Sequence, residues 1–386
     1  MDKKFVMGIA AMAALTLVSC SSDDLDSFSD NSSKNEAISF DGYLGRSAVA
    51  VNGTRGSVET KETLKTNGFA VFGKYTPTEG QPSDFFDNQK VTYSTTTSKW
   101  TYTPLRYWPT NGRIDFFAYA PHKEGQKLKS NTTTFDFTVE PKAADQIDLL
   151  WANAAGKITE NFEGTTKEKV NFLFKHALSR LGYTVKLSGN YSPDNATFTL
   201  RKITLAGSPD ETKEAFYKTG TIDLSKTDTK ENLSMTNKPT GLWTAATDNN
   251  KQNFTWFEGS YKVESSEPKH PTTSQNKDYS DKDYLFVIPQ DFSQTKTEGH
   301  DVDELYVIVE YDVAYKSGTP TTTITNKVYK KLPIKFEQGK AYKLNLTIGL
   351  PIEFDIDVEN VAGVEDWDPK DGTPTDIDSW DDISRK

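Results

Sequence analysis

Apolar and polar residues alternate along much of this chain, and the alternation is typical of β-strands. In residues 37–43, Ile38 and Phe40 alternate with polar side chains. A period of two places every second side chain on the same face of a strand. We therefore expect a strand here and others at residues 69–75, 90–93, 99–102, 113–121, 135–139, 148–152, 183–187, 196–205, 220–224, 253–257, 284–289, 305–314, 326–334, 341–348 and 352–358.

Residues 113–121 (RIDFFAYAP) carry apolar bulk on both faces of their predicted strand. Ile114 and Phe116 point to one side, and Phe117 and Tyr119 point to the other. A strand that is apolar on both faces belongs in the interior of a layered sheet structure. We therefore expect this segment to be an interior strand of a sandwich.

One segment combines helical and strand-like patterns. Phe174, Leu178 and Leu181 have helical spacing, whereas their flanks alternate as in strands, so we expect a short helical turn between two strands.

A polar loop rich in Gly, Thr and Lys precedes this segment, and we place a domain boundary in that loop. With 386 residues, the chain is long enough for two domains. The sequence thus predicts an all-β protein with short helical turns, an N-terminal sandwich over residues 37–165 and a C-terminal sandwich over residues 166–358.

The first residues predict export. Lys3 and Lys4 precede an apolar run that is too short to span a membrane, which is typical of a secretory signal peptide over residues 1–19. The run ends in Leu-Val-Ser-Cys, which resembles a bacterial lipobox, and Cys20 is the only cysteine of the chain. We expect lipidation at Cys20, an outer-membrane anchor and a flexible polar tether over residues 20–36. The acidic SSDD that follows resembles the signal that sends lipoproteins of the Bacteroides group to the outer face of the outer membrane.

Charge and composition narrow the range of functions. The formal net charge is −10, which argues against nucleic acid as a partner. The four histidines are widely spaced, so a zinc site is not expected. Residues 366–377 lack the Glu that closes a calcium loop, and residues 359–386 form an acidic tail. We expect no cofactor, no metal and no catalytic site, and we interpret His176, which has apolar neighbours, as a structural residue.

Two arginines lie in small, polar, Gly-containing sequence shortly after the first predicted strand. Arg46 lies in LGRSAV and Arg55 in GTRGSV. Exposed loops of small residues are preferred sites of proteolysis. The segment fits either an ordinary surface loop or a site for a trypsin-like protease.

A set of motifs in order along the chain resembles the fimbrillin family of Bacteroides-type bacteria. They are the lipobox at Cys20, the Ile-Ser-Phe strand before Arg46, PLRYWP and RIDFFAYAP in 104–121, DLLWA at 148–152, FKHALSRL at 174–181, GKxYxL at 339–344 and the acid-Trp pair near 366–367. This resemblance implies two transthyretin-like, Greek-key β-sandwich domains and a surface subunit of a type V pilus. It also implies a lipoprotein precursor, removal of the N-terminal segment by an arginine-specific protease, preferably after Arg46, and joining of subunits by strand exchange.

The expected partners are other fimbrial subunits, the protease, and host or microbial surface ligands. Loss of the strand with Ile38 and Phe40 would open an apolar groove for a donor strand. Residues 352–358, with Ile352, Phe354, Ile356 and Val358, are either that donor or simply the last strand of their own domain. An alternative function is a glycan-binding surface lipoprotein for nutrient uptake, which would expose an aromatic row around Trp243 and Trp256.

Overall fold

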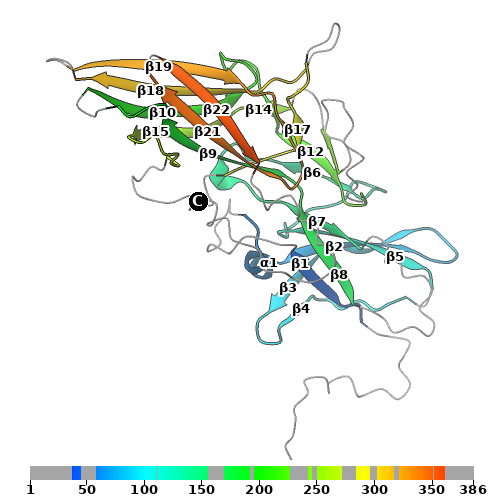
Figure 1. Ribbon diagram of the computed structural model, residues 1–386. Coiled ribbons are helices and arrows are strands. Elements are labelled where there is room, and N and C mark those ends of the chain that lie inside the picture. Colours follow the sequence, from blue (N-terminus) through cyan, green and yellow to red (C-terminus); the bar gives the residue numbers. More distant parts are fainter. Residues whose placement is uncertain are drawn as a thin grey trace, which may run out of the picture.

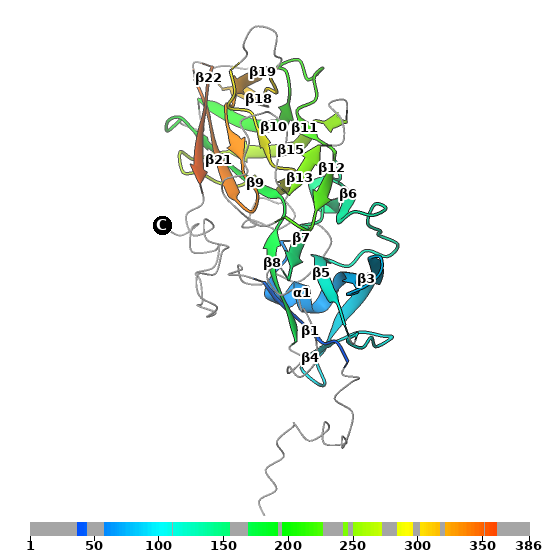
Figure 2. The same ribbon diagram turned by 90° about the vertical axis from the view of Figure 1, so that its right-hand side faces the viewer.

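The structure is a computed structural model. It describes residues 37–44, 58–109, 111–154, 169–191, 195–226, 242–245, 250–271, 284–295, 302–316, 321–350 and 352–360. Cys20, Arg46, Arg55 and the acidic tail after residue 360 lie outside these residues. Figures 1 and 2 show two groups of sheets that follow one another along the molecule, and strands dominate both. The prediction of an all-β protein is confirmed.

The first group is one sheet. Its seven strands in the described part of the chain are, in spatial order, β1 (Phe40–Leu44), β8 (Val170–His176), β7 (Leu150–Asn153), β5 (Arg113–Ala120), β2 (Phe69–Thr76), β3 (Ser83–Ser94) and β4 (Lys99–Thr101). β1 also contacts β4 at the opposite end of the order, so the sheet curls around its inner face. We call the buried cluster on that face, which contains Phe40, Phe69, Phe116 and Phe172, the first core.

The second group holds two four-stranded sheets. The strands of one sheet are, in spatial order, β15 (Phe254–Val263), β10 (Ala196–Ala206), β18 (Tyr306–Tyr315) and β19 (Thr322–Lys331). The strands of the other are β16 (Leu285–Val287), β9 (Ser179–Leu187), β21 (Ala341–Gly349) and β22 (Glu353–Asn360). Smaller pairings complete the described strands: β13 (Trp243–Ala245), β12 (Thr219–Asp223) and β6 (Thr134–Thr138); β11 (Phe216–Tyr217) with β14 (Lys251–Gln252); and β17 (Gln290–Asp291) with β20 (Lys335–Phe336).

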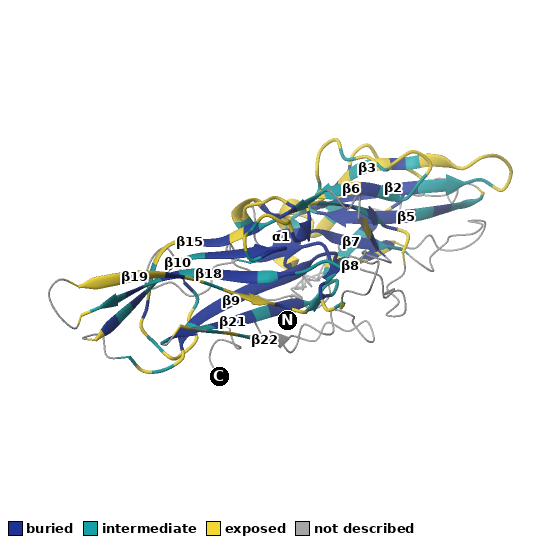
Figure 3. Ribbon diagram, turned by 90° about the horizontal axis from the view of Figure 1, so that it is seen from above, coloured by how far each residue is buried: buried dark blue, intermediate teal, exposed yellow. Residues whose placement is uncertain are grey.

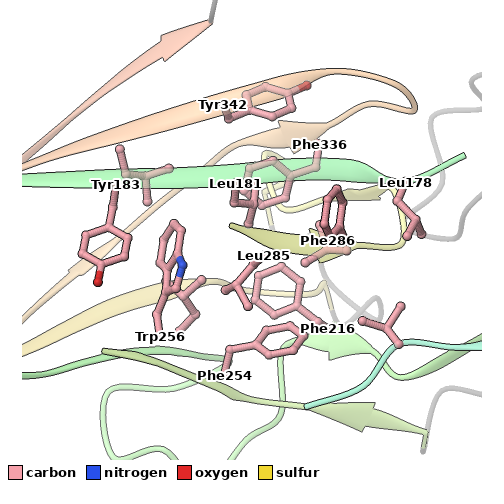
Figure 4. Close-up of a cluster of buried hydrophobic side chains, with 14 of the residues drawn as sticks. Leu178, Leu181, Tyr183, Phe216, Phe254, Trp256, Leu285, Phe286, Phe336 and Tyr342 are labelled. Carbon is pink, nitrogen blue, oxygen red and sulfur yellow. The ribbon is translucent and has the colours of Figure 1, made fainter. Parts of the chain in front are cut away.

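A second core fills the space between these sheets. Figure 4 shows aromatic and aliphatic side chains that meet there from several strands, including Tyr183 and Trp256, whose ring centroids are 4.6 Å apart. Figure 3 shows the contrast between the buried strands of the interior and β19, which is exposed over most of its length. Burial of such large rings is the main favourable contribution to the stability of this part of the chain.

The interior strand predicted at residues 113–121 is confirmed as β5. It lies between β7 and β2, and its two faces serve different cores. Phe116 belongs to the first core, whereas Tyr119 faces the second core and approaches Phe135 of β6 at 5.1 Å between ring centroids. The outer face of the first sheet therefore packs against the second group of strands.

The helical turn predicted around Leu178 is wrong. β8 ends at His176 and β9 begins at Ser179, so only two residues, Ala177 and Leu178, separate two strands. The apolar residues around Leu178 happen to have helical spacing, because a strand that is buried on both faces, such as β9, shows no alternation of apolar and polar residues. The predicted boundary between residues 165 and 166 also fails to separate the sheets, because β8 lies after it and joins the first sheet through β1 and β7.

Two helical segments lie elsewhere in the described residues. A 3₁₀ turn spans Ala143–Asp145, and the sequence did not predict α1 (Lys61–Asn67). Thr60 and Thr63 form a capping box at the start of α1, because each side chain bonds the backbone N–H of the other. A seven-residue helix is too short to be stable alone, so its burial against β1 and β3 decides its formation.

Candidate assembly interface

β1 lies at one end of the first sheet and is held mainly by a single neighbouring strand. It pairs in parallel with β8, from Phe40 opposite Val170 to Leu44 opposite Phe174. On its other side, the N–H of Ile38 donates to the carbonyl of Arg106 at 2.8 Å, just outside the strand. β1 is therefore an edge strand with a second, shorter backbone attachment.

The inward side chains of this segment are nevertheless in the centre of the first core. Ile38 is 1% exposed and Phe40 is 2% exposed. Four aromatic rings surround Phe40, with centroids at 5.2 to 5.9 Å: Tyr102, Phe86, Phe116 and Phe172. The Tyr102 hydroxyl also donates to the carbonyl of Ile38 at 2.8 Å. Removal of β1 would therefore leave an apolar groove with unpaired backbone groups.

The outward face of β1 is polar or exposed. Asp41 pairs with Lys169 at 3.4 Å, and the Tyr43 hydroxyl donates to Asp41 at 2.9 Å. Tyr43 is 50% exposed, next to Leu173 of β8, which is 37% exposed. The strand thus has one buried and one solvent-facing side, as its alternation predicts.

The two candidate cleavage sites, Arg46 and Arg55, lie outside the described residues, but their places in the sequence are informative. Arg46 follows the end of β1 by two residues, and Arg55 precedes the buried residue Val58 by three. Residues 45–57 are the only covalent connection from β1 forward to the rest of the sheet. A cut at either arginine would leave β1 attached by non-covalent contacts alone.

A buried polar network fixes the chain immediately after this connection. The N–H of Glu59 donates to Asp148 at 2.9 Å, and Asp148 lies 2.8 Å from Nδ1 of His176. Thr63 and Asn67 of α1 donate to the Glu59 carboxylate at 2.8 and 2.7 Å. Burial raises the pKa of Glu59 to about 7, despite the opposing hydrogen bond from Thr63. Burial also lowers the pKa of His176, while the Asp148 carboxylate acts in the opposite direction.

The C-terminal candidate occupies a different environment. β22 is the outermost strand of its sheet and pairs antiparallel with β21. Phe354, Ile356 and Val358 pack against the second core but are only partly buried, and Ile352 is 65% exposed. The structure does not bring these residues together with Ile38 and Phe40 within one chain, since the two strands lie in different sheets.

The residues proposed for a glycan platform are in the interior. Trp243 is 1% exposed and donates its indole N–H to the carbonyl of Ala177 at 2.6 Å. Trp256 is 8% exposed and packs on Tyr183 (Figure 4). These two tryptophans do not form an exposed aromatic row, because both serve the second core.

Other chemistry is limited in the described part of the chain. Within it, no group of three or more His, Cys, Asp or Glu residues is arranged to hold a metal ion. None of its helices has the length and apolar character needed to cross a membrane. Sequence reasoning missed Phe86, Tyr102 and Phe172, whose rings pack around Phe40. Of these, Phe172 had a usable signal, because it alternates with Phe174 along β8.

Known proteins that resemble this chain include proteins of bacterial fimbriae. Fimbrium subunit Fim1C of Phocaeicola vulgatus is 28% identical over 375 residues, which cover 88% of this chain and 91% of that protein. The crystal structure of a fimbrial protein from Bacteroides vulgatus ATCC 8482 shares the fold with a TM-score of 0.54, at 21% identity over 84% of this chain and 99% of that one. A putative cell adhesion protein from Bacteroides uniformis aligns with a TM-score of 0.43 at 15% identity, over 84% of this chain and 98% of that one.

The family model described as Fimbrillin-like matches residues 54–367. This match covers well over half of the 386 residues, and the chain belongs to the fimbrillin-like family. The resemblance drawn from its motifs is thereby confirmed. The protein is of the fimbrial class, with its place at the fimbrium or cell surface.

Proposed function

We propose that this chain is a pilus subunit that is exported as a lipoprotein and assembled by protease-triggered strand exchange. Its precursor carries lipid on Cys20 and stays anchored in the outer membrane. An arginine-specific protease cuts after Arg46 or Arg55, β1 departs, and a strand from another subunit fills the groove. The observation that carries the proposal is the position of β1, an edge strand that precedes both arginines and whose segment buries Ile38 and Phe40 almost completely.

The energetics support a stable precursor and a groove that requires refilling. Burial of one large apolar side chain contributes about 1.5–3 kcal/mol, so Ile38 and Phe40 together contribute roughly 3–6 kcal/mol. Loss of β1 would forfeit this contribution and expose Phe86, Tyr102 and Phe172 to water. A replacement strand restores both the apolar burial and the backbone pairing with β8, which is the physical basis of β-augmentation.

Cleavage of the purified precursor tests this proposal. After incubation with an arginine-specific protease, N-terminal sequencing should find a new start at Ser47 or Gly56. Unboiled SDS gels should then show ladders that collapse on boiling, and electron microscopy should show filaments. Arg46→Ala and Arg55→Ala, made singly and together, identify the site. A cleaved protein that stays monomeric and never accepts a strand would refute strand exchange.

Lipid anchoring is tested separately. Cys20→Ser should abolish metabolic labelling with palmitate and release the precursor from the membrane fraction, because the acyl chains that hold it there would be attached through Cys20. Ser19→Ala, next to the modified residue, is the matched control and should still be labelled. Unchanged labelling of Cys20→Ser would show that the anchor is elsewhere.

A further inference from the structure

β19, in the second group of strands, presents an unpaired edge to solvent. It is the last strand of its four-stranded sheet, and its whole length pairs with β18. Among the described strands none is hydrogen-bonded to its other side, and Figure 1 shows β19 along the margin of the second group. Its sequence, TTITNKVYKK, contains neither Pro nor Gly, the residues that interrupt strand pairing. β19 therefore offers one continuous edge to a partner strand.

The pairing with β18 shows which backbone groups of β19 face outward. The N–H of Leu332 donates to the carbonyl of Leu305 at 2.8 Å, one position beyond the paired residues Lys331 and Tyr306. In an antiparallel ladder, hydrogen-bonded and non-hydrogen-bonded pairs alternate. The even-numbered residues of β19 therefore bond to β18. The odd-numbered residues, from Thr323 onward, direct their N–H and C=O groups away from the sheet.

Two large apolar side chains on this strand are open to solvent. Ile324 is 48% exposed and Tyr329 is 57% exposed. Ile324 lies opposite Val313, on the side of the sheet that faces the second core. Tyr329 lies on the outer side, where its ring is 6.2 Å from that of Tyr306 between centroids. A further strand at this edge would cover both side chains, and burial of apolar surface is favourable.

The lysines of β19 are held by acids of the same chain. Each of the three pairs with one acidic residue: Lys327 with Glu211, Lys331 with Glu304, and Lys330 with Asp355 of β22. Lysines on an edge strand normally discourage a second strand, because their charges would be opposed or stripped of water. Here the charges are already compensated within the chain. The edge is therefore compatible with a partner strand, provided that no lysine lies opposite another.

The sequence of β19 is complementary to itself when two copies run antiparallel. Such a pair is related by a two-fold axis perpendicular to the sheet, which keeps each face of the sheet on one side. With the axis at Asn326, the residues that lie opposite each other are Ile324 and Val328, Thr325 and Lys327, and Thr323 and Tyr329. Two apolar side chains then meet on the core side, a threonine meets the tyrosine on the outer side, and no two lysines are opposed.

From these observations we infer that the exposed edge of β19 binds β19 of a second copy of this chain, antiparallel and about a two-fold axis at Asn326. The two four-stranded sheets join into one continuous sheet across the contact. The odd-numbered residues exchange N–H and C=O bonds with those of the second copy, which pairs backbone groups that face water in the single chain. The two Asn326 side chains meet at the axis, and they are suited to bond each other because an amide both donates and accepts.

Charge selects this register over its nearest rival. The two axes that keep most of β19 paired pass through Asn326 and Lys327, which lie at the middle of the strand. An axis at Lys327 would place its ammonium group directly beside the same group of the second copy. Like charges at opposed positions are destabilising. The axis at Asn326 avoids this repulsion and places Lys327 opposite Thr325.

The contact is independent of strand exchange at β1, because it uses a strand of a different sheet. A contact through one strand edge is small, so it is weak between free copies. Subunits held at one cell surface are at a high effective concentration, and a weak contact that repeats along neighbouring subunits gains from multivalency. We therefore expect the contact to act sideways between chains at the surface where the fimbrillin-like family functions.

Disulfide trapping in mixtures of two single-cysteine proteins tests the partner and the register. Every protein is full-length and carries Cys20→Ser, so that the introduced thiol is the only one. One protein carries Thr323→Cys and the other Tyr329→Cys, at exposed positions that lie opposite each other in the pairing. Opposed residues of antiparallel strands have Cα atoms about 4.5–5.5 Å apart, within the range that a disulfide spans. The control mixture, Thr323→Cys with Thr325→Cys, is out of register and too distant to bridge.

After mild oxidation, the mixture of Thr323→Cys and Tyr329→Cys should give about ten times more reducible dimer on non-reducing gels than either protein alone or the control mixture. The excess over each protein alone is specific to the antiparallel register, because a residue in this pairing never lies opposite itself except at the axis. Equal yields in all samples would mean random collision and would overturn the inference, while strand exchange at β1 would still stand.

A proline substitution tests whether the outward backbone groups carry the contact. Thr325→Pro, added to both cysteine proteins, removes an outward N–H and leaves the bonds to β18 in place. Thr325→Val is the matched control, because it also loses the hydroxyl bond to Asp312 but keeps the N–H. The proline should lower the dimer yield about tenfold and the valine less than about twofold, with folded circular dichroism spectra for both. Equal trapping of the two folded variants would overturn the inference, and the cysteine comparison decides without the proline.

Discussion

β1 and β22 are both edge strands with the same alternation, and yet they contribute very differently to the fold. β1 inserts Phe40 into the first core, together with Ile38 just before the strand, and the two side chains are 2% and 1% exposed. β22 covers one flank of the second core with side chains that remain partly exposed. An edge position in a sheet therefore does not by itself make a strand dispensable. Curvature of the sheet decides how much a strand at its edge buries.

The curl of the first sheet explains this difference. β1 contacts β8 on one side and β4 near the other, and α1 also contacts it. The inner face of β1 is thus enclosed by the sheet to which it belongs. Among the described strands, β22 pairs with β21 on one side and has no hydrogen-bonded partner on the other, where it contacts β19 of the neighbouring sheet (Figure 1). The comparison predicts large effects of substitutions in β1 and modest ones in β22.

The largest effect is expected for Phe40→Ala in the uncleaved precursor. Truncation of a fully buried phenylalanine leaves a cavity and typically costs about 3–5 kcal/mol in unfolding free energy. Urea denaturation measures the change. Tyr43→Ala, on the exposed face of the same strand, should change stability by less than about 1 kcal/mol. Equal small effects of both substitutions would show that β1 is not part of the first core.

The next largest effect is expected at Glu59, which follows the proposed cleavage sites in the sequence, and it concerns the pH dependence of the unfolding free energy. Its pKa is raised from 4.5 to about 7 in the folded state. The stability it contributes is fully present below pH 4.5 and is lost as the pH rises through 7, a difference of roughly 3 kcal/mol at about 1.4 kcal/mol per pH unit. Glu59→Gln should remove this slope in denaturation curves from pH 4 to 8.

Two features make the Glu59 experiment specific. The pKa of His176 is lowered, so the stability that His176 contributes is lost as the pH falls, opposite to the effect of Glu59. Both proteins contain His176, so its effect on the slope cancels in the comparison. Glu62→Gln, at an exposed position of α1, is the matched control and should leave the slope unchanged. Parallel pH profiles for Glu59→Gln and the unaltered protein would show that Glu59 titrates normally in the folded state.

A smaller effect on stability is expected in β22. Phe354→Ala should cost about 1–2 kcal/mol in the monomer, less than Phe40→Ala, because the ring is only partly buried. The double variant Phe354→Asp with Ile356→Asp separates the two roles of the strand. If residues 352–358 act as donor, this monomer should stay folded in circular dichroism while polymers vanish from unboiled gels. An unfolded monomer would assign β22 to the core of its own domain alone.

The smallest effect belongs to the exposed acid of β22. A hydrogen bond from Lys330 lowers the pKa of Asp355, so the stability it contributes is present at neutral pH and is lost as the pH falls through its folded value. An exposed ion pair of this kind contributes about 0–1 kcal/mol. Asp355→Asn should therefore change the melting temperature by no more than about 2–4 °C, with less effect in high salt. A larger loss would mean that β22 is held by its charges rather than by its apolar face.

Much of the fold was readable from the chain because period-two alternation reports burial directly. Phe40, β5 and the alternating segments near both ends were assigned to the correct kind of element, although β1 begins at Phe40 and leaves Ile38 just outside it. The failures have a common cause. β9 is buried on both faces and shows no alternation, so helical spacing at Phe174, Leu178 and Leu181 was misread as a turn. α1 was missed because seven residues carry too short a periodic signal.

The sequence by itself determined that this is an all-β chain, and its ordered motifs identified its family. It also placed two arginines just after the first strand, since covalent order is a property of the chain alone. Only the tertiary structure decided that β1 completes the first core, because the aromatic residues around Phe40 come from strands far apart in sequence. Tertiary structure likewise decided that β8 belongs to the first sheet and that Trp243 and Trp256 are buried. Pairing and enclosure depend on how the sheets curl and pack, and no local pattern of residues encodes that geometry.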